Sequence, residues 1–423
     1  MLTFRAMFPF LLVCVSVMVA DGVSFRVEKV GKIKTRGAAG FEHFQIDGKD
    51  YVASANFFTS SPGRNPSMKT TSVVYRVRKS KNSNKLRFKR INSLQTVGAH
   101  GVEFFTRNNE SYIAIPNYYG GDSVVYRWSR SSLKFEEIQR MKSDGAGSIE
   151  SFTIPAVKQG EPPRRVLGIA EFNLGIAALY VIEGAFPNER FVLWQRLLFP
   201  GVGAMATCTI GGHHLLLASS YVTKQRGWHT RSGVFYFNQK SDSFVFHHDI
   251  GTVGAHDVET LTVAGNRHFA FFSNDKDESS TYQHSELFEW RQGMVPGMGN
   301  GFLSGRFVSR QKVFTHGAHA AEFFATSVSA NDSKYFLAVA NLGDRKTNKY
   351  RTTSQLYAFD VEQVKLTKVQ EMPTLGATDM ESFSIKGTSY LIAAEEQDDD
   401  RGGDIESTVW ALVEDKDGRG VEL

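Results

Sequence analysis

The sequence predicts an all-β chain folded as a seven-bladed β-propeller of four-stranded blades, with the last blade completed by the N-terminal strand. Three observations support this fold class. A Gly-Ala-x-x-x-Glu-x-Phe motif occurs seven times at intervals of roughly 50–60 residues, as the repeats of propellers and solenoids do. Each copy is followed by short segments rich in Val, Ile, Phe and Tyr that alternate with period two, which indicates β-strands. The last copy lacks one strand, and the N-terminus has one to spare.

The motif opens the first predicted strand of each unit. Its clearest copies are GAHGVEFF (98–105), GAHDVETL (254–261) and GATDMESF (376–383). The seven copies begin at Gly37, Gly98, Gly145, Gly203, Gly254, Gly317 and Gly376.

The other three strands follow in a fixed order. An apolar run such as YIAIPN (112–117) provides the second strand, and SVVYRW (123–128) provides the third. The fourth strand leads back to the next Gly-Ala, as in LRFKRINSLQTVGAH (86–100). Seven such units fall within the usual range of about 4–8 blades. The segment SFRVEKVGKIKT (24–35) resembles a fourth strand, so we expect it to close the ring within the last blade and leave no open edge there.

The 423-residue chain is expected to form a single propeller domain over residues 21–423, preceded by a signal peptide over residues 1–20. The apolar stretch MFPFLLVCVSVMVA (7–20) follows Arg5 and is too short to span a bilayer. We therefore expect a secreted, extracellular protein without a membrane anchor.

The cysteines and sequons fit an extracellular glycoprotein. Cys14 would leave with the signal peptide, so no internal disulfide is expected, and Cys208 is interpreted as a buried, inert thiol. The sequons at Asn109 and Asn331 fall in turns between first and second strands, on the face opposite the motif loops. Both are predicted to carry glycans.

The sixth motif residue is a glutamate in six copies. A carboxylate beside a packing Phe is expected to be partly buried and must then be hydrogen-bonded. We interpret the set as architectural, each glutamate accepting backbone N–H groups within its own or the next blade. The seven residues are Glu42, Glu103, Glu150, Cys208, Glu259, Glu322 and Glu381.

An aspartate two residues before the glutamate occurs in two copies. It pairs Asp257 with Glu259 and Asp379 with Glu381 at one end of predicted inner strands, and the acidic loop 395–400 opens on the same face, as does the loop 274–278. Because Ca²⁺ prefers six to eight oxygen ligands, these four side chains are the candidate ligands of a channel calcium ion. The alternative is a solvated acidic rim.

Three histidines, His100, His256 and His319, follow Gly-Ala in their repeats. We expect them to pack in loops or to bind backbone groups. Their blades are not all adjacent and no His-x-His pair occurs, so the spacing gives little support to a zinc site.

Basic residues cluster in the predicted outer hairpin of the first blade, in a chain of formal charge +5. For a secreted protein the natural polyanionic partner is a sulfated glycan rather than nucleic acid. An outer edge protected by lysines against strand pairing is the equally weighted alternative. The residues are Arg76, Arg78, Lys79, Lys81, Lys85, Arg87, Lys89 and Arg90.

Together, Gly-Ala-x-Asp-x-Glu-x-Phe, Tyr-Leu-x-x-Ala-Asn and Ser-x-x-Tyr-Arg-Trp resemble the epilepsy-associated repeat (EAR, epitempin or EPTP) family over about residues 24–414. The family includes the leucine-rich glioma-inactivated proteins and thrombospondin-type laminin G and EAR proteins. The resemblance implies a seven-bladed propeller that binds extracellular proteins, among them ADAM-type receptors. It also implies that the counterparts of the channel calcium ligands are Asp257, Glu259 and Asp379. The family's companion domains are not evident, so no particular receptor is implied.

The leading functional interpretation is a secreted protein-binding module, a receptor or matrix ligand, that is not an enzyme and uses its loop face. The first alternative is an extracellular matrix or mineral-associated structural protein. The second is a calcium-dependent hydrolase using His256 and Asp257, which is disfavoured because no G-x-S-x-G, HExxH or Walker motif occurs.

Overall fold

The computed structural model describes residues 24–60, 65–156, 160–263, 267–293, 304–329, 332–347 and 349–415. The predicted signal peptide, Cys14 and the sequon asparagine Asn331 lie outside these ranges. Within them, no helix is long and apolar enough to cross a bilayer.

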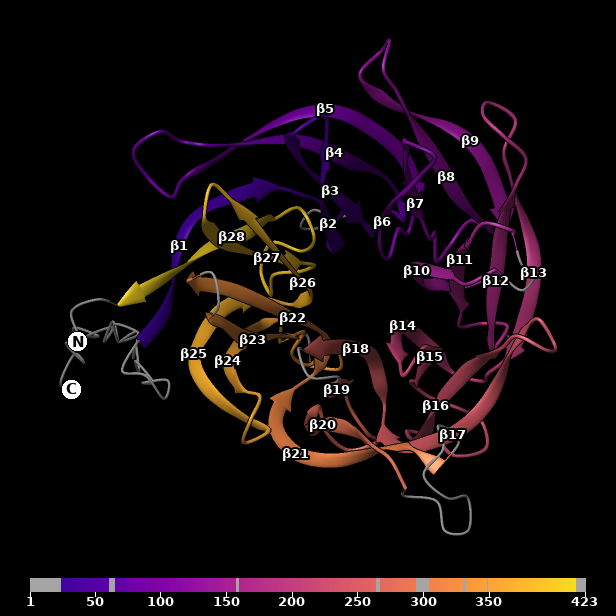
Figure 1. Cartoon of the computed structure of the whole chain (residues 1–423). Coiled ribbons are helices and arrows are strands. Elements are labelled where there is room, and N and C mark those ends of the chain that lie inside the picture. Colours follow the sequence, from indigo (N-terminus) through magenta and orange to yellow (C-terminus); the bar gives the residue numbers. More distant parts are fainter. Residues whose placement is uncertain are drawn as a thin grey trace, which may run out of the picture.

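The described residues form seven four-stranded antiparallel sheets arranged as blades around a central axis, so the predicted all-β propeller is confirmed (Figure 1). The innermost strands are β2 (Ala38–Ile46), β6 (Glu103–Arg107), β10 (Ala146–Ile154), β14 (Val202–Ile210), β18 (Ala255–Val263), β22 (Ala318–Ser329) and β26 (Ala377–Ile385). The second strands are β3 (Lys49–Asn56), β7 (Glu110–Ile115), β11 (Arg164–Glu171), β15 (His213–Ser220), β19 (Arg267–Asn274), β23 (Asp332–Asn341) and β27 (Thr388–Glu395).

The third strands are β4 (Lys69–Lys79), β8 (Asp122–Ser129), β12 (Ile176–Glu183), β16 (His229–Asn238), β20 (Tyr282–Arg291), β24 (Arg351–Asp360) and β28 (Glu406–Asp415). The outer strands are β5 (Leu86–Val97), β9 (Lys134–Lys142), β13 (Arg190–Leu198), β17 (Ser243–Val253), β21 (Arg306–His316), β25 (Lys365–Leu375) and β1 (Ser24–Lys34). Blades are numbered below in chain order, from the blade that begins with β2.

The N-terminal strand closes the ring as predicted. β1 pairs with β28 in antiparallel register from Ser24–Asp415 to Lys34–Glu406, and the two strands lie side by side in Figure 1. The side chain of Ile33 is buried with residues of blades 7 and 1. Phe25 is buried with residues of blades 6 and 7. The first residues of the propeller therefore hold its last blade together.

A glycine in the left-handed region precedes every inner strand. Its φ lies between 52° and 78° in all seven blades. Its carbonyl accepts a hydrogen bond of 2.7–3.0 Å from the N–H that follows the second strand, as Gly254 does from Asp275. A Cβ on Gly254 would stand 2.2 Å from the carbonyl oxygen of Lys276, so both conformation and space require glycine.

The structure corrects the motif register in blade 4. The left-handed glycine that accepts this hydrogen bond is Gly201, donated by Tyr221, and not Gly203. Ala206, opposite Leu217, therefore occupies the position that Glu259 holds opposite Phe271. Cys208, expected at the glutamate position, lies two residues further along, where the other blades carry their packing residue. The sequence GVGAMA contains two glycines, and the Gly-Ala pair marked the wrong one.

Apolar side chains fill the interfaces between consecutive blades. Each buried cluster joins two neighbouring blades; Phe44 of blade 1, for example, stacks on Phe104 of blade 2 with ring centroids 4.5 Å apart. The partly buried Cys208 packs in the interface of blades 4 and 5, and burial raises the pKa of its thiol to about 12. This agrees with the interpretation of an inert thiol.

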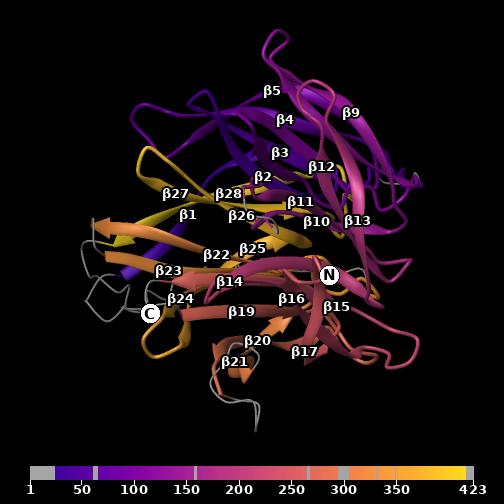
Figure 2. The same cartoon turned by 45° about the vertical axis from the view of Figure 1, so that its right-hand side comes forward.

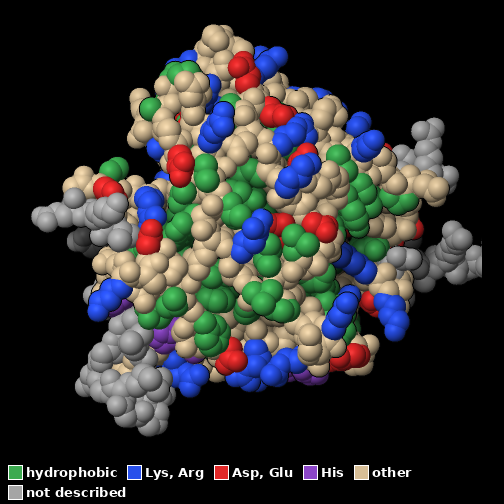
Figure 3. Space-filling model, turned by 90° about the vertical axis from the view of Figure 1, so that its right-hand side faces the viewer, with side chains coloured by type: hydrophobic (Ala, Val, Ile, Leu, Met, Phe, Trp, Pro, Cys, Tyr) green, Lys and Arg blue, Asp and Glu red, His purple; other side chains and the backbone are tan. Residues whose placement is uncertain are grey.

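The outer rim exposes several apolar side chains. Leu198 of β13 is 78% exposed and Phe246 of β17 is 57% exposed. Figure 3, which faces the side of the ring that carries β9 and β13, shows hydrophobic side chains interspersed with Lys and Arg. The tilted view in Figure 2 shows the outer strands wrapping the ring.

Deleting residues 24–35 is expected to lower the melting temperature sharply or prevent folding, because it opens the ring. The milder change Ile33→Ala should cost about 2–5 kcal/mol, as for other buried Ile-to-Ala changes. Thermal unfolding followed by circular dichroism measures both, with the exposed Lys29→Ala as a control. An unchanged melting temperature after the deletion would contradict the closure.

Candidate functional site: the central channel and its mouth

A β-bulge re-aims one residue of the inner strand in most blades. In six blades the register shifts immediately after the second motif residue, so the third residue is left unpaired. Bulges turn such a side chain away from the regular alternation of the strand. The third to sixth motif residues line a channel cavity of about 270 Å³ on the propeller axis.

The glutamates of the sixth position link each blade to the next. Glu381 Oε1 accepts the backbone N–H of His43 at 2.7 Å, and Glu103 Oε1 accepts that of Ser151 at 3.1 Å. Glu322 Oε1 accepts the hydroxyl of Ser382 at 2.6 Å. In each case the donor is the seventh motif residue of the following blade. The architectural interpretation is thus confirmed for these glutamates, with the bonds running between blades.

The two aspartates make an equivalent link one layer nearer the mouth. Asp257 Oδ2 accepts the N–H of Ala321 at 3.0 Å, and Asp379 Oδ2 accepts that of Phe41 at 2.9 Å. All four candidate calcium ligands line the same cavity. The structure therefore brings Asp257, Glu259, Asp379 and Glu381 together, along with the other channel glutamates.

The channel carboxyls lie in a poorly solvated, like-charged environment. Burial raises the pKa of Glu103 to about 7, that of Glu322 to about 8 and that of Asp257 to about 7. Burial raises the pKa of Asp379 to about 6. For Glu42, burial and then repulsion from Glu381 raise the pKa well above its ordinary range. Such a ring favours either bound protons or a bound cation.

Blade 4 interrupts this ring. Ala206 provides no carboxylate, and the hydroxyl of Thr260 in blade 5 instead donates to the carbonyl of Thr207 at 2.9 Å. A side-chain-to-backbone bond between blades is thus kept, and the donor still belongs to the following blade, but here that blade supplies the side chain and blade 4 the backbone group.

The three motif histidines converge above the carboxyl ring. One ring nitrogen from each of His100, His256 and His319 lies within 4.8 Å of the others. The ring centroids of His256 and His319 are 3.5 Å apart. Each Nδ1 lies 2.8–3.1 Å from a backbone carbonyl of the following blade, so the expected backbone bonding is confirmed. The sequence analysis did not predict this convergence, because it treated histidines on non-adjacent blades as distant from one another. The usable signal was histidine at the same motif position in three copies, because a propeller gathers each motif position around its axis.

Large side chains surround the mouth of the channel. They belong to the residues that follow the second strands, whose N–H groups bind the motif glycines. Blades 1–4 contribute the partly exposed aromatic rings of Phe57, Tyr118, Phe172 and Tyr221. At the same position blades 5–7 carry Asp275, Leu342 and Glu396, whose side chains are buried. Arg345 binds Glu396 Oε2 at 2.9 Å, and its guanidinium is 41% exposed. The accessible aromatic rings of the mouth therefore belong to blades 1–4, and Arg345 provides an accessible charge from blade 6.

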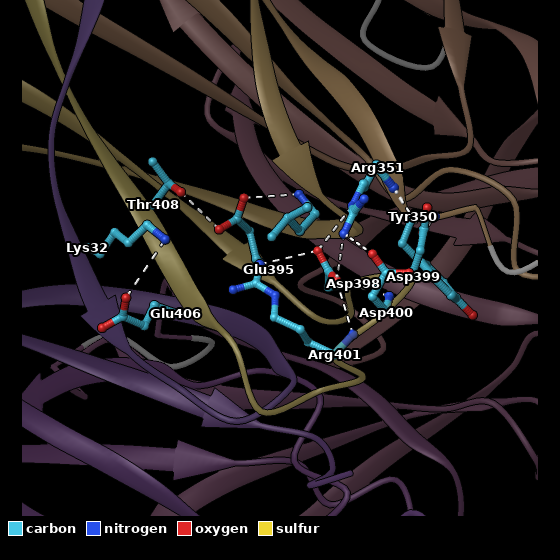
Figure 4. A network of polar contacts seen from close by, with 11 residues as sticks. Lys32, Tyr350, Arg351, Glu395, Asp398, Asp399, Asp400, Arg401, Glu406 and Thr408 are labelled. Carbon is cyan, nitrogen blue, oxygen red and sulfur yellow. Dashed lines mark hydrogen bonds and ion pairs between the residues drawn. The ribbon is translucent and has the colours of Figure 1, made fainter. Parts of the chain in front are cut away.

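The acidic loop after β27 is largely neutralised by arginines. Figure 4 shows Asp398 between Arg351 and Arg401, with contacts of 3.2 Å to each. Although burial opposes it, these hydrogen bonds lower the pKa of Asp398 below its ordinary value. The carboxylate of Asp400 also binds Arg351. These aspartates hold loop structure and are not aimed at the channel carboxyls.

The remaining predicted sites lie away from the channel. Asn109 is exposed in the β6–β7 turn, at the end of the blade opposite the motif glycine. The basic cluster lies on β4, β5 and their turn, with Arg78 paired opposite Arg87 and Arg76 opposite Lys89. Like charges directly opposite each other are unfavourable on a sheet. No ion pair joins any of these eight cations to an acidic side chain of the described residues.

The EPTP domain family profile matches residues 28–76, 87–129 and 365–397. The chain is related to the EAR (EPTP) proteins. It is 27% identical over 313 residues to the thrombospondin-type laminin G domain and EAR repeat-containing protein of Mus musculus, covering 70% of this chain and 42% of the relative. The Homo sapiens protein of the same name is 24% identical, covering 61% of this chain and 38% of its own length. The chain thus spans about two fifths of the length of the curated relatives it matches.

Solved structures support the propeller fold of this chain. A putative 6-phosphogluconolactonase from Bacteroides fragilis aligns with a TM-score of 0.52 at 14% identity, covering 87% of this chain and 96% of that one. A protein from Lactobacillus plantarum aligns with a TM-score of 0.50 at 11% identity, covering 82% and 92%. At such identities the likeness concerns the fold alone.

Replacing Glu103 by Gln should stabilise the metal-free protein at neutral pH and leave it unchanged near pH 4.5. The raised pKa means that the folded state holds its proton more tightly, so the stability contributed by the wild-type carboxyl is full below the unfolded value of 4.5 and is lost as the pH rises through about 7. The variant should gain up to about 3 kcal/mol across that window. Unfolding in urea with EDTA at several pH values measures it, with the exposed Glu362→Gln as the control. A pH-independent difference would contradict the assignment.

Proposed function

We propose that this EAR propeller is a secreted, non-enzymatic binding module that engages an extracellular protein, a receptor or a matrix component, through the mouth of its channel. The relationship to EAR proteins is the observation that carries the proposal. That relationship favours recognition of a protein partner. The partly exposed aromatic side chains at the mouth favour the face with the channel mouth over the other surfaces of the propeller.

The mouth has the chemistry of an interaction surface. Aromatic residues and arginine are enriched at protein interfaces, where they supply large contact areas with few rotatable bonds. Phe57 lies 5.8 Å from Tyr119 and 6.3 Å from Tyr118 in ring centroid distance, which forms a partly exposed aromatic cluster beside the channel. Glycosylation of Asn109 would leave this face free because the turn lies at the other end of its blade.

Sulfated glycans are a second class of partner for the same module. The observation that favours them is the cross-strand pairing of Arg78 with Arg87 and of Arg76 with Lys89, which concentrates positive charge without ion pairs recorded among the described residues. A polyanion would relieve that repulsion. The β4–β5 turn projects from the rim of the ring, where a long chain can reach it (Figure 1).

Binding is proposed over hydrolysis because the candidate catalytic residues, His256 and Asp257, bond to separate backbone groups of blade 6 and not to each other. His256 Nδ1 donates to the carbonyl of His319 at 3.1 Å, while Asp257 accepts from the N–H of Ala321. A matrix-associated structural role is the alternative, and fractionation of the secreted protein into soluble and insoluble matrix pools distinguishes it.

The double variant Phe57→Ala/Tyr118→Ala should lose the specific partners of the wild-type chain, because it removes the aromatic contacts of the mouth. The full chain is fused to a proximity-labelling enzyme in the native extracellular space, and labelled proteins are identified by mass spectrometry. Phe246→Ala, an exposed aromatic on the outer rim, is the matched control and should keep the partners.

Heparinase treatment of the same tissue, together with Arg78→Glu/Arg87→Glu, separates glycan from protein partners. If partner labelling is lost on heparinase treatment and in Arg78→Glu/Arg87→Glu but is kept in the mouth variant, the basic hairpin is the binding surface. An unchanged set of labelled proteins in the mouth variant would refute the proposal that the mouth is the binding face.

We also propose that the channel carboxyls bind a structural calcium ion. Asp257, Glu259, Asp379 and Glu381 line one cavity together with Glu42, Glu150 and Glu322. The described residues place no lysine or arginine among the lining side chains of that cavity. An oxygen-only, uncompensated acidic site fits a hard cation, which would supply the missing positive charge and keep the carboxyls ionised.

Calcium should raise the melting temperature relative to EDTA by about 2–5 °C at saturation, in buffer freed of transition metals. Asp257→Asn/Asp379→Asn should abolish that difference, since it removes two oxygen charges from the site. Asp400→Asn, in the exposed acidic loop, should leave it intact. Equal melting temperatures of the wild type with calcium and with EDTA would show that no useful site exists.

A further inference from the structure

We propose that His100, His256 and His319 form a binding site for a divalent transition metal ion of the Zn²⁺ type at the mouth of the channel, one layer above the carboxyl ring. The site lies in the same channel cavity as the proposed calcium site and differs from it in its ligand residues and in their chemistry. Imidazole nitrogen suits Zn²⁺, Cu²⁺ and Ni²⁺, whereas Ca²⁺ takes oxygen ligands.

The geometry of the three rings fixes which nitrogen is available. Each Nδ1 faces a backbone carbonyl: His100 that of Gly147 at 2.8 Å, His256 that of His319 at 3.1 Å, and His319 that of Thr378 at 2.9 Å. A carbonyl oxygen can only accept, so each Nδ1 must carry the proton. Each Nε2 then has a free lone pair, which is the arrangement that orients histidines on metal ions.

A buried atom lacks the partner that such a metal would provide. His319 is 2% exposed, and its Nε2 has no hydrogen-bond partner among the described residues. Leaving a buried polar atom without a partner destabilises the folded protein. A metal ion coordinated by this nitrogen would remove that destabilisation.

The separation of the donors fits one ion after a small adjustment. The three nitrogens lie within 4.8 Å of one another. Nitrogens on a tetrahedral zinc ion with bonds of about 2.0–2.1 Å are about 3.3 Å apart, so the donors need to close by at most about 1.5 Å. Rotation of the rings about their carbonyl-bonded Nδ1 atoms would have to provide this closure.

The surrounding charges permit a cation. Arg345 opposes one, but its charge is compensated by the ion pair with Glu396. Asp257 directly follows His256 in the chain and lines the same cavity as the three histidines, as does Asp379. Burial keeps the imidazoles neutral at pH 7 by lowering the pKa of each, so no proton competes with the metal there.

A metal ion at this site would link opposite sides of the propeller. The three ligands come from blades 2, 5 and 6, which do not all neighbour one another, so one ion would join both sides of the channel. Three protein ligands leave a fourth position for water or for a side chain of a bound partner, as in zinc sites that keep an open position.

The test uses the full chain stripped with chelator and dialysed against Zn²⁺, with uptake measured by elemental analysis and affinity by calorimetry. We expect about one equivalent per chain and a rise in melting temperature of about 2–5 °C at saturation. Substitution with Co²⁺ should give the visible absorption of a four-coordinate site with nitrogen ligands. Stoichiometric uptake well below one equivalent, with no change in melting temperature, would overturn the proposal without any mutation.

Asparagine variants separate the metal role from the structural role. His100→Asn and His256→Asn place an amide N–H where Nδ1 was, so they preserve the bond to the carbonyl while removing Nε2. Each should weaken Zn²⁺ affinity at least about tenfold and leave the melting temperature of the metal-free protein nearly unchanged. His229→Ala, an exposed histidine away from the channel, should bind as the wild type does.

The carboxyl variants provide the opposing outcome. If Asp257→Asn/Asp379→Asn abolishes Zn²⁺ uptake while the two asparagine variants of the histidines bind normally, the ion occupies the acidic ring and the histidine site is refuted. The expected result is the reverse, with calcium stabilisation lost in the aspartate variant and zinc affinity lost in the histidine variants.

Discussion

One backbone hydrogen bond organises every blade of this propeller: the N–H after the second strand donates to the carbonyl of the left-handed glycine before the first. It fixes where the inner strand begins and requires glycine for both conformation and space. In most blades a bulge follows immediately and turns the third motif residue out of the ladder. The same bond places the donor residue at the mouth of the channel. One contact, repeated seven times, therefore determines the channel lining and the residues that surround its entrance.

The inner strands are then linked by side chains in a repeated pattern. Carboxylates at the fourth and sixth motif positions accept N–H or hydroxyl groups of the next blade, while apolar residues pack the interfaces further out. These links carry an electrostatic cost, since several carboxyls share a small, poorly solvated cavity and their pKa values are raised. The carboxylates therefore stabilise the ring through their hydrogen bonds and destabilise it through burial and mutual repulsion of their charges. Bound protons reduce that repulsion, and a bound cation would also do so.

Function is concentrated where the copies of the repeat differ. Glycine, alanine and the packing residues recur because every blade needs them. Histidine occurs at the third position in three blades and aspartate at the fourth in two, and neither is required by the architecture. The same holds around the mouth, where four blades present aromatic rings and three present Asp275, Leu342 and Glu396. The aromatic rings are partly exposed whereas Asp275, Leu342 and Glu396 are buried, so the entrance differs from one side to the other.

The sequence by itself determined the blade number, the strand order, the closure by residues 24–35 and the linking role of the glutamates, because all of these follow from a periodic pattern that local backbone chemistry imposes. It misplaced the register of blade 4, where GVGAMA contains two glycines and only the hydrogen bond to Tyr221 identifies Gly201. It also could not bring His100, His256 and His319 together, because the distance between residues on blades 2, 5 and 6 depends on the closed ring. Closure of the ring brings residues at the same motif position in different blades together around the axis. That convergence, and with it the chemistry of the channel, belongs to the tertiary structure alone.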